Sequence, residues 1–222
     1  MIFGLPAPAL LACVLGGYLL GSIPFGVIIT RLAGAGDVRQ IGSGNIGATN
    51  VLRTGRRDLA FLTLIGDGGK GAVAVLVAHV LWGDTAAALA GALSFLGHLF
   101  PVWLGFKGGK GVATFFGIMI AAAWPVGLLA GATWIAMAFL LRISSLSALT
   151  AVTLAPIYAF LLHAGMPVIG LALFTGVLVH VRHHENIRRL LKGEEPRIGA
   201  SAKGPAPAAQ DSLGHNGGPP LA

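Results

Sequence analysis

Residues 112–141 read VATFFGIMIAAAWPVGLLAGATWIAMAFLL, and this stretch decides how often the chain can cross a membrane. It is uncharged over about 30 positions. A single helix of that length would extend about 45 Å, which is too long for the hydrocarbon core of a typical bilayer. Because Pro125 lies near the middle, we expect two short, packed helices that meet at Trp124-Pro125.

The composition of the chain is that of an integral membrane protein. Hydrophobic residues make up 55% of the 222 positions and charged residues only 10%, whereas about a quarter of the residues in soluble domains are charged. Long uncharged runs indicate helices rather than a barrel. The net charge of +7 does not indicate nucleic acid, because the basic residues lie between apolar runs and favour the cytoplasmic membrane surface. The single cysteine, Cys13, leaves no thiol pair.

The placement of the basic residues indicates the number of helices and their orientation. We expect an all-α protein with seven transmembrane helices, at about residues 5–30, 59–82, 85–104, 112–123, 125–141, 146–162 and 167–181. With this count the basic loops share one side, the other side holds only Asp84 and His163, and Lys70 lies within a helix. The positive-inside rule then puts the N-terminus outside and the C-terminus in the cytoplasm. Six helices would place the basic segment after Val181 outside.

We expect one membrane-embedded domain, residues 1–195, followed by a tail. From Pro196 to Ala222 the composition shifts to Ala, Gly, Pro and Ser with few charges. Such a composition is typical of disorder, so we expect residues 196–222 to form a disordered cytoplasmic tail outside the site.

The first cytoplasmic loop is rich in glycine and in hydrogen-bonding side chains. Residues 42–53 read GSGNIGATNVLR and contain no acid. Backbone N–H groups, amides, hydroxyls and a guanidinium together suit a polyhydroxylated phosphate ester. The alternative is a polar turn with a helix cap, because Ser, Asn and Gly favour both.

A glycine-lysine loop, GFKGGKG at residues 105–111, directly precedes the apolar stretch. Glycines let backbone N–H groups approach an anion closely, and two lysines add positive charge. The loop is not a Walker A sequence, because Lys110 is followed by Gly111 rather than Ser or Thr. The alternative is a flexible basic turn between membrane helices. We expect His98, on the preceding helix, to be a packing residue rather than a base.

A third polar segment, HHENIRRLLKGEE at residues 183–195, follows the last apolar run. On a helix, His183 and Asn186 share a face. We expect no metal here, since His183, His184 and Glu185 point apart and no third ligand group is evident.

Two further pairs of ionisable residues need an interpretation. His79 and Asp84 match the His-x4-Asp pattern of a different acyltransferase superfamily, but they fall across the bilayer from the glycine-rich loops, so we attribute the match to chance. Asp67 and Lys70 are three residues apart inside a membrane helix, where ionisable residues are functional by default. Mutual charge compensation is the simplest account, and Lys70 is also a candidate to face a phosphate.

Together the three polar segments resemble the motifs of the bacterial acyl-phosphate:glycerol-3-phosphate acyltransferases, the PlsY family. Residues 43–53 are similar to the first motif of that family. Residues 97–101 with 106–114 resemble the second, and residues 183–195 resemble the third. The resemblance covers nearly the whole chain up to about Glu195, and it is specific because all three motifs occur in order on one predicted membrane face.

The resemblance implies an enzyme of the bacterial inner membrane, with its active site facing the cytoplasm. It would transfer a fatty acyl group from acyl-phosphate to the 1-hydroxyl of sn-glycerol 3-phosphate, giving lysophosphatidic acid and phosphate. It implies no cofactor or metal, and as partners glycerol 3-phosphate, long-chain acyl-phosphate, membrane lipids and the soluble enzyme that makes acyl-phosphate. By motif match, the catalytic residues that hold the glycerol phosphate would be Ser43, Arg53, Lys110, His183 and Asn186. The other substrate- and phosphate-binding residues would be Gly44, Asn45, Gly47, Thr49, Asn50, Lys70, Lys107, Gly108, Gly109, Gly111 and Thr114.

The implied chemistry agrees with what these residues offer. Acyl-phosphate is already activated, so positioning and stabilisation of the developing oxyanion could carry most of the acceleration. The hydroxyl proton goes either to the substrate's phosphate or to His183, and the sequence leaves both open. The main alternative is a transporter of an organic phosphate or other anion, which would bind its substrate near midplane. Against it, the glycine-rich motifs lie at one face and no repeat pairs the two halves. A non-catalytic scaffold would leave the glycine-lysine loop unexplained.

Overall fold

The computed structural model describes residues 4–199, and the chain in that range contains helices and no β-strand. Single 3₁₀ turns occur at Val38–Gln40, Leu52–Thr54 and Val102–Leu104. Most of the expected tail, residues 200–222, lies outside the described residues, so its expected disorder stays a prediction. The helices are α1 (Ala7–Gly21), α2 (Phe25–Leu32), α3 (Ala48–Val51), α4 (Arg57–Trp82), α5 (Asp84–Leu99), α6 (Val112–Ala122), α7 (Trp124–Leu141), α8 (Ser144–Leu161), α9 (Met166–Arg182) and α10 (His184–Leu191).

Proline and glycine mark the main breaks between helices. Helix α6 ends at Ala122 and α7 begins at Trp124, which confirms the break expected at Trp124-Pro125. Pro125 lies in the first turn of α7, where the missing N–H costs no intrahelical hydrogen bond. Gly83 has a φ of +79°, a backbone conformation that favours glycine, and this allows the sharp turn from α4 to α5.

The lengths of the helices confirm an all-helical membrane protein. Within residues 4–199, five helical segments, one of them α1 and α2 together, are long and apolar enough to cross a membrane, and the bent pair α9 and α10 would make a sixth. Helix α6 has 11 residues and so extends only about 17 Å, less than the roughly 30 Å of a bilayer core. The expected seventh crossing depends on this short helix.

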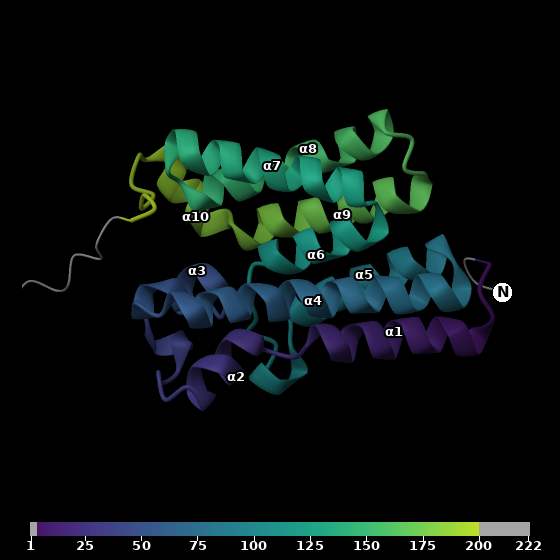
Figure 1. Cartoon of the computed structure of the whole chain (residues 1–222), viewed down its shortest axis with the longest axis horizontal. Helices are drawn as coiled ribbons and strands as arrows, with labels where there is room; N and C mark the ends of the chain where they lie inside the picture. The colour runs from purple at the N-terminus through teal and green to yellow at the C-terminus, as the bar shows by residue number, and fades with distance from the viewer. Residues whose placement is uncertain (1–3, 200–222) are drawn as a thin grey trace, which may run out of the picture.

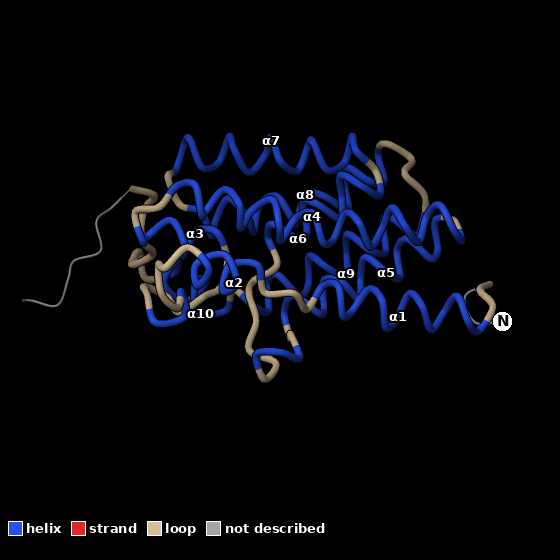
Figure 2. Tube along the Cα trace, turned by 60° about the horizontal axis from the view of Figure 1, so that its bottom comes forward, coloured by secondary structure: helices blue, strands red, loops and turns tan. Residues whose placement is uncertain are grey.

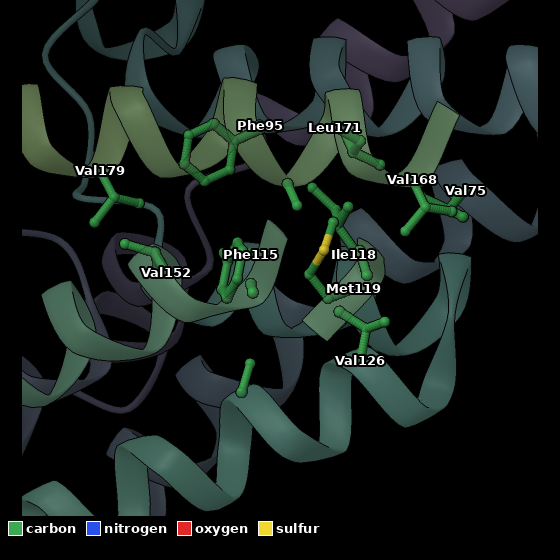
Figure 3. Packing of buried hydrophobic residues seen from close by; sticks show 14 of the residues in the cluster. Val75, Phe95, Phe115, Ile118, Met119, Val126, Val152, Val168, Leu171 and Val179 are labelled. Atoms are coloured by element: carbon green, nitrogen blue, oxygen red, sulfur yellow. The ribbon is translucent and has the colours of Figure 1, made fainter. Parts of the chain in front are cut away.

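Helix α6 lies between two groups of helices. Figure 1 shows α1, α4 and α5 below it and α7, α8 and α9 above it, and α6 contacts both α4 and α7. The largest hydrophobic cluster forms around it. Phe115, Ile118 and Met119 of α6 are fully buried there with Phe95 of α5, as Figure 3 shows.

Small residues bring the helix backbones close together. A Cβ on Gly21 of α1 would lie 2.0 Å from the carbonyl oxygen of Ser94, and one on Gly117 of α6 would lie 2.0 Å from that of Gly68. Such contacts are typical of helix packing in membranes. Large apolar side chains instead cover the outside, where Phe139 of α7 is 85% exposed, as expected of a surface that faces lipid.

Helix α5 stops part-way along the bundle. It has 16 residues and runs back beside α4, which has 26, so it cannot reach the level at which α4 begins. In Figure 1 the chain between α5 and α6 accordingly leaves the bundle at mid-length. The glycine-lysine loop, which leads into α6, therefore lies part-way along the bundle and does not reach its end.

Candidate active site

The motif-bearing segments lie toward one end of the bundle. In Figure 1, α3, α10 and the last described residues occupy the end opposite the N-terminus, and Figure 2 shows loops gathered at this same end. The first loop leads into α3, the glycine-lysine loop leads into α6, and the third segment contains α10.

Asn50 organises the first loop from its centre. Its side chain is buried, and Nδ2 donates to the carbonyl oxygens of Val38, Ile41 and Asn45 at 2.8–2.9 Å. Its Oδ1 accepts from the backbone N of Ser43 at 3.1 Å. The side chain that sequence reasoning assigned to phosphate thus holds the loop together, and it positions Ser43.

The other predicted residues of the first loop shape its backbone. Gly44 has a φ of +68°, and its N–H donates to Ile41 O at 2.9 Å. The Oδ1 of Asn45 accepts from the N–H of Gly47 at 3.0 Å, as in an Asx turn. Thr49 is exposed on α3, where its side chain is accessible to a ligand.

Arg53 extends across the first loop next to Ser43. A Cβ on Gly42 would lie 2.7 Å from Arg53 Nη1, so the guanidinium rests on this glycine. Within residues 4–199 the Arg53 side chain makes no hydrogen bond or ion pair, whereas Arg39 pairs with Asp37 at 2.6 Å. Hydrogen bonds from Arg39 hold the pKa of Asp37 well below its ordinary value. Arg53, unlike Arg39, is therefore open to an anion.

The glycine-lysine loop packs tightly on the end of α5. The N–H of Gly108 donates to Leu99 O and that of Gly109 to His98 O, each at 3.1 Å. A Cβ on Gly108 would lie 2.2 Å from His98 O. These two amides were expected to hold phosphoryl oxygens, but they already bond to carbonyls, so packing is what requires glycine here. In the described part of the chain, the amides of Lys110 and Gly111 have no hydrogen-bond partner.

Three of the predicted phosphate-binding residues have contrasting positions. Lys107 is exposed. Thr114, in the first turn of α6, is fully buried against Gly71 of α4. Lys70 is buried as well, with Nζ 3.0 Å from Asp67 Oδ1 and donating to Ile23 O at 2.7 Å. Its ammonium is therefore held inside the bundle, which agrees with the expected charge compensation.

Lys110 and the third segment are joined by a chain of hydrogen bonds. Lys110 Nζ donates to Asn186 Oδ1, and Asn186 Nδ2 donates to Glu195 Oε1 at 2.5 Å. Ser145 Oγ also donates to Glu195 Oε1, and Arg189 Nε donates to Glu195 Oε2, both at 2.7 Å. The structure thus unites two predicted catalytic residues, Lys110 and Asn186, and anchors them through Glu195.

Charge and burial tune the groups in this chain. Burial, and next the neighbouring Arg189 charge, lower the pKa of Lys110 below its ordinary value. Burial alone would raise the pKa of Glu195, but hydrogen bonds from Asn186, Ser145 and Arg189 lower it. The site therefore combines a partly buried lysine with a carboxyl group that holds its neighbours through hydrogen bonds.

His183 lies between α9 and α10, next to this cluster, and one of its ring nitrogens already has a hydrogen-bond partner. The side chain is 3% exposed, and Nδ1 lies 2.8 Å from the carbonyl oxygen of Val179. Because a carbonyl oxygen can only accept, Nδ1 carries the hydrogen of this bond, and Nε2 of the neutral ring remains an acceptor.

Sequence reasoning did not single out Arg182, Ser145 or Glu195. Arg182 Nη2 donates to Gly108 O at 3.0 Å and Nε to Gly109 O at 3.2 Å, which clamps the glycine-lysine loop to the end of α9. The only feature of the sequence that could have pointed to Arg182 was its position directly before His183. Glu195 lay inside the third segment without an assigned role, and no pattern pointed to Ser145.

Some of the predicted residues are not joined by direct contacts. Within residues 4–199, no hydrogen bond or ion pair links the first loop to Lys110 or to the third segment. His79 and Asp84 pair at 2.9 Å at the turn between α4 and α5, away from the motif-bearing end. The described residues contain no cluster of three His, Cys, Asp or Glu side chains placed to bind a metal ion.

Known proteins resemble this chain in both sequence and structure. A family model described as "Glycerol-3-phosphate acyltransferase" matches residues 11–193. Proteins of that name from Caulobacter vibrioides and Cereibacter sphaeroides are 66% identical over 202 residues and 62% identical over 187 residues. These matches cover 88% and 84% of this chain, and 93% and 88% of the relatives.

Two crystal structures of PlsY (YgiH), an integral membrane glycerol 3-phosphate acyltransferase, are also similar. The glycerol 3-phosphate form has a TM-score of 0.82 at 40% identity and covers 86% of this chain and 96% of its own. The lysophosphatidic acid form has a TM-score of 0.80 at 39% identity, covering 86% and 95%.

Proposed function

The chain belongs to the glycerol-3-phosphate acyltransferase family and is an acyltransferase enzyme, and from this premise we propose its donor, its site and its topology. The donor is a long-chain acyl-phosphate. The acceptor is the 1-hydroxyl of sn-glycerol 3-phosphate, and the products are lysophosphatidic acid and inorganic phosphate. The structural neighbours described in glycerol 3-phosphate and lysophosphatidic acid forms support this assignment of acceptor and product.

The observation that carries the proposal is the chain of hydrogen bonds from Lys110 through Asn186 to Glu195. It presents an ammonium, an amide and the N–H groups of Lys110 and Gly111 at the start of α6. Such donors suit a phosphate ester, and the N-terminus of a helix adds a favourable dipole. Lys110 and Asn186 would bind the substrate here, while Gly108 and Gly109 allow the turn that carries Lys110.

The first loop would complete the binding of glycerol phosphate. Arg53 has no partner in the described residues and lies beside Ser43. A guanidinium can bind two phosphate oxygens at once, and a hydroxyl can donate to a third. We assign Arg53 and Ser43 to the phosphate, with Gly44, Gly47 and Asn50 as the residues that hold the loop in shape.

His183 would orient the attacking hydroxyl. Its Nδ1–H is bonded to Val179 O, so Nε2 can accept a hydrogen bond from the 1-hydroxyl. The glycerol oxygen attacks the acyl carbonyl carbon, and the bond from that carbon to the phosphate oxygen breaks. The hydroxyl proton leaves with the phosphate, either directly or by way of Nε2. The nearby positive charge stabilises the developing oxyanion.

We also propose seven crossings, with α6 as a short seventh helix packed between longer neighbours. The N-terminus is outside, and the motif-bearing end faces the cytoplasm of a bacterial inner membrane. The basic residues at this end support that orientation. The acyl chain enters from the membrane lipids, and the soluble enzyme that makes acyl-phosphate delivers it at this face.

An assay of the purified protein with three donors tests the proposed reaction. Glycerol 3-phosphate is supplied with acyl-phosphate, acyl-CoA or acyl carrier protein, and lysophosphatidic acid is measured. Of the three donors, we expect only acyl-phosphate to support acylation. One inorganic phosphate should be released for each lysophosphatidic acid formed. Equal rates with acyl-CoA would contradict the assigned donor.

A further inference from the structure

A buried triad, formed by Asp67 and Lys70 of α4 with His98 of α5, has no part in the chemistry described above. The Asp67–Lys70 pair spans 3.0 Å, and His98 Nδ1 lies 3.6 Å from Asp67 Oδ1. The three side chains are 1%, 1% and 3% exposed. Removing charges from water inside a membrane segment is expensive, and a buried ion pair often contributes no net stability. Stability alone is therefore a poor reason for this cluster.

On one side, the triad holds the chain that leads to the first loop. Lys70 Nζ donates to Ile23 O at 2.7 Å, at the break where α1 gives way to α2. Helix α2 in turn packs on the first loop, because a Cβ on Gly26 would lie only 1.9 Å from Ile46 O. Lys70 thus fixes the start of α2, and through it the loop that carries Ser43 and Arg53.

On the other side, the triad supports the glycine-lysine loop. The N–H of Gly109 donates to His98 O at 3.1 Å. A Cβ on Gly109 would lie 2.2 Å from His98 Nε2, and its other nearest atoms belong to the same imidazole. The backbone of Gly109 therefore rests on the His98 ring, one residue before Lys110.

We propose that Asp67, Lys70 and His98 are positioning residues that hold the glycine-lysine loop in register with the first loop, and so set where Lys110 and Arg53 meet the substrate phosphate. Lys70 anchors the first loop, the His98 ring supports the second, and Asp67 joins the two. This inference rests on the proposed function, because it requires the glycine-lysine loop to carry a substrate-binding lysine.

The contact between Gly109 and the imidazole permits a rescue experiment. Gly109→Ala places a methyl group against the His98 ring and should displace Lys110, lowering kcat/KM for glycerol 3-phosphate by at least about tenfold. His98→Ala removes the support and should raise KM more than it changes kcat. In the double variant the new methyl group occupies the space that the ring has left, so kcat/KM should lie within about threefold of His98→Ala alone.

Gly108→Ala is the matched control. Its methyl group would lie 2.2 Å from His98 O and 2.6 Å from Leu99 O, and these backbone atoms remain when the ring is removed. His98→Ala should therefore not rescue Gly108→Ala. If the effects of Gly109→Ala and His98→Ala multiply as independent losses, or if His98→Ala keeps the parental KM, the positioning role is overturned.

A charge-neutral replacement of the ion pair gives a second test that does not depend on His98→Ala folding. Asp67→Asn combined with Lys70→Met removes both charges together, a change that often leaves stability unaltered or improved. Positioning predicts that this double variant purifies with parental thermal stability but loses at least about tenfold in kcat/KM for glycerol 3-phosphate. A purely structural pair predicts parental kcat/KM per folded molecule, and that result would refute the proposal.

The same assays separate this inference from the function on which it rests. A parent protein that acylates no glycerol 3-phosphate contradicts the proposed function, and the positioning role with it. An active parent together with independent effects in the rescue experiment contradicts the positioning role only.

Discussion

Arg53 can be either a phosphate clamp or a positive charge that orients the protein in the membrane, and Arg53→Lys separates the two. Lysine keeps the charge but supplies only a point charge, whereas a guanidinium can bind two phosphate oxygens at once. We expect normal membrane insertion and a loss of at least roughly tenfold in kcat/KM for glycerol 3-phosphate, about 1.4 kcal/mol.

Two neighbouring arginines serve as controls for Arg53→Lys. Arg56 pairs with Asp58 at 2.6 Å, and Arg57 begins α4 outside the matched motif. Arg56→Lys and Arg57→Lys should lose much less activity. If Arg53→Lys acylates glycerol 3-phosphate as the parent does, the clamp is misassigned and Lys110 becomes the better candidate.

Lys110 should give the enzyme an alkaline limit. Burial lowers the pKa of its ammonium below the ordinary 10.5, so raising the pH deprotonates it earlier than a free lysine. The neutral amine cannot neutralise a phosphate. We expect kcat/KM for glycerol 3-phosphate, which reports the free enzyme, to fall at a pH below 10.5.

Lys110→Arg tests the origin of that alkaline limit. Arginine stays charged at every pH used, since its pKa exceeds about 12. Whatever activity this variant keeps should therefore show no alkaline fall from this position. If kcat/KM of Lys110→Arg falls at alkaline pH as it does in the parent, another group causes the fall.

At the scale of elements, Glu195 ties the segment that follows α10 to α8 and to α10 itself. It accepts hydrogen bonds from Ser145, Asn186 and Arg189. Glu195→Gln should cost about 2 kcal/mol of stability, as expected for hydrogen bonds to a charged group, and should also raise KM because Asn186 loses its anchor. Thermal unfolding in detergent and steady-state kinetics measure these two effects.

The cost of Glu195→Gln should depend on pH in a defined direction. The folded protein lowers the pKa of Glu195 below the ordinary 4.5, so the stabilisation is fully present above pH 4.5. It is lost as the pH falls from there through the lower folded value. The stability difference between parent and variant should therefore shrink below pH 4.5. Glu194→Gln, at an exposed neighbour, is the matched control and should show neither effect.

The candidate site was only partly predictable from the sequence. The resemblance to the family's motifs pointed to Lys110, Asn186 and His183, because polar residues close together in the sequence leave a visible pattern. The partners of the glycine amides did not leave one, since His98 O and Leu99 O are backbone atoms whose role depends on how the loop folds back. Ser145 meets Glu195 across 50 positions of sequence, and no local pattern records such a contact.

At the scale of the whole molecule, the proposed orientation puts all the motif-bearing loops in the cytoplasm. Single cysteines placed in the loops after Thr30, Leu104 and Val181 should react with an impermeant reagent only from the cytoplasmic side. The native Cys13 is buried and can be replaced to remove background. Labelling of residues 43–53 from outside intact cells would contradict both the seven crossings and a shared site.

The architecture followed from the sequence more closely than the site did. Apolar runs and Pro125 predicted where helices begin and end, because burial in lipid acts on whole segments. The shortness of α5 and the packing of the loop before α6 on the end of α5 were not predicted. The position of this loop depends on close backbone contacts, such as Gly108 against His98 O, that hydrophobicity does not encode.

The most direct test of the account is the steady-state activity of purified Lys110→Met with acyl-phosphate and glycerol 3-phosphate. This change keeps the length of the side chain and removes its charge. We expect parental thermal stability with a loss of at least about a hundredfold in kcat/KM for glycerol 3-phosphate, roughly 2.7 kcal/mol. Lys192→Met, at an exposed lysine at the end of α10, should stay within about threefold of the parent. Parental kcat/KM in Lys110→Met would contradict a site built around this lysine.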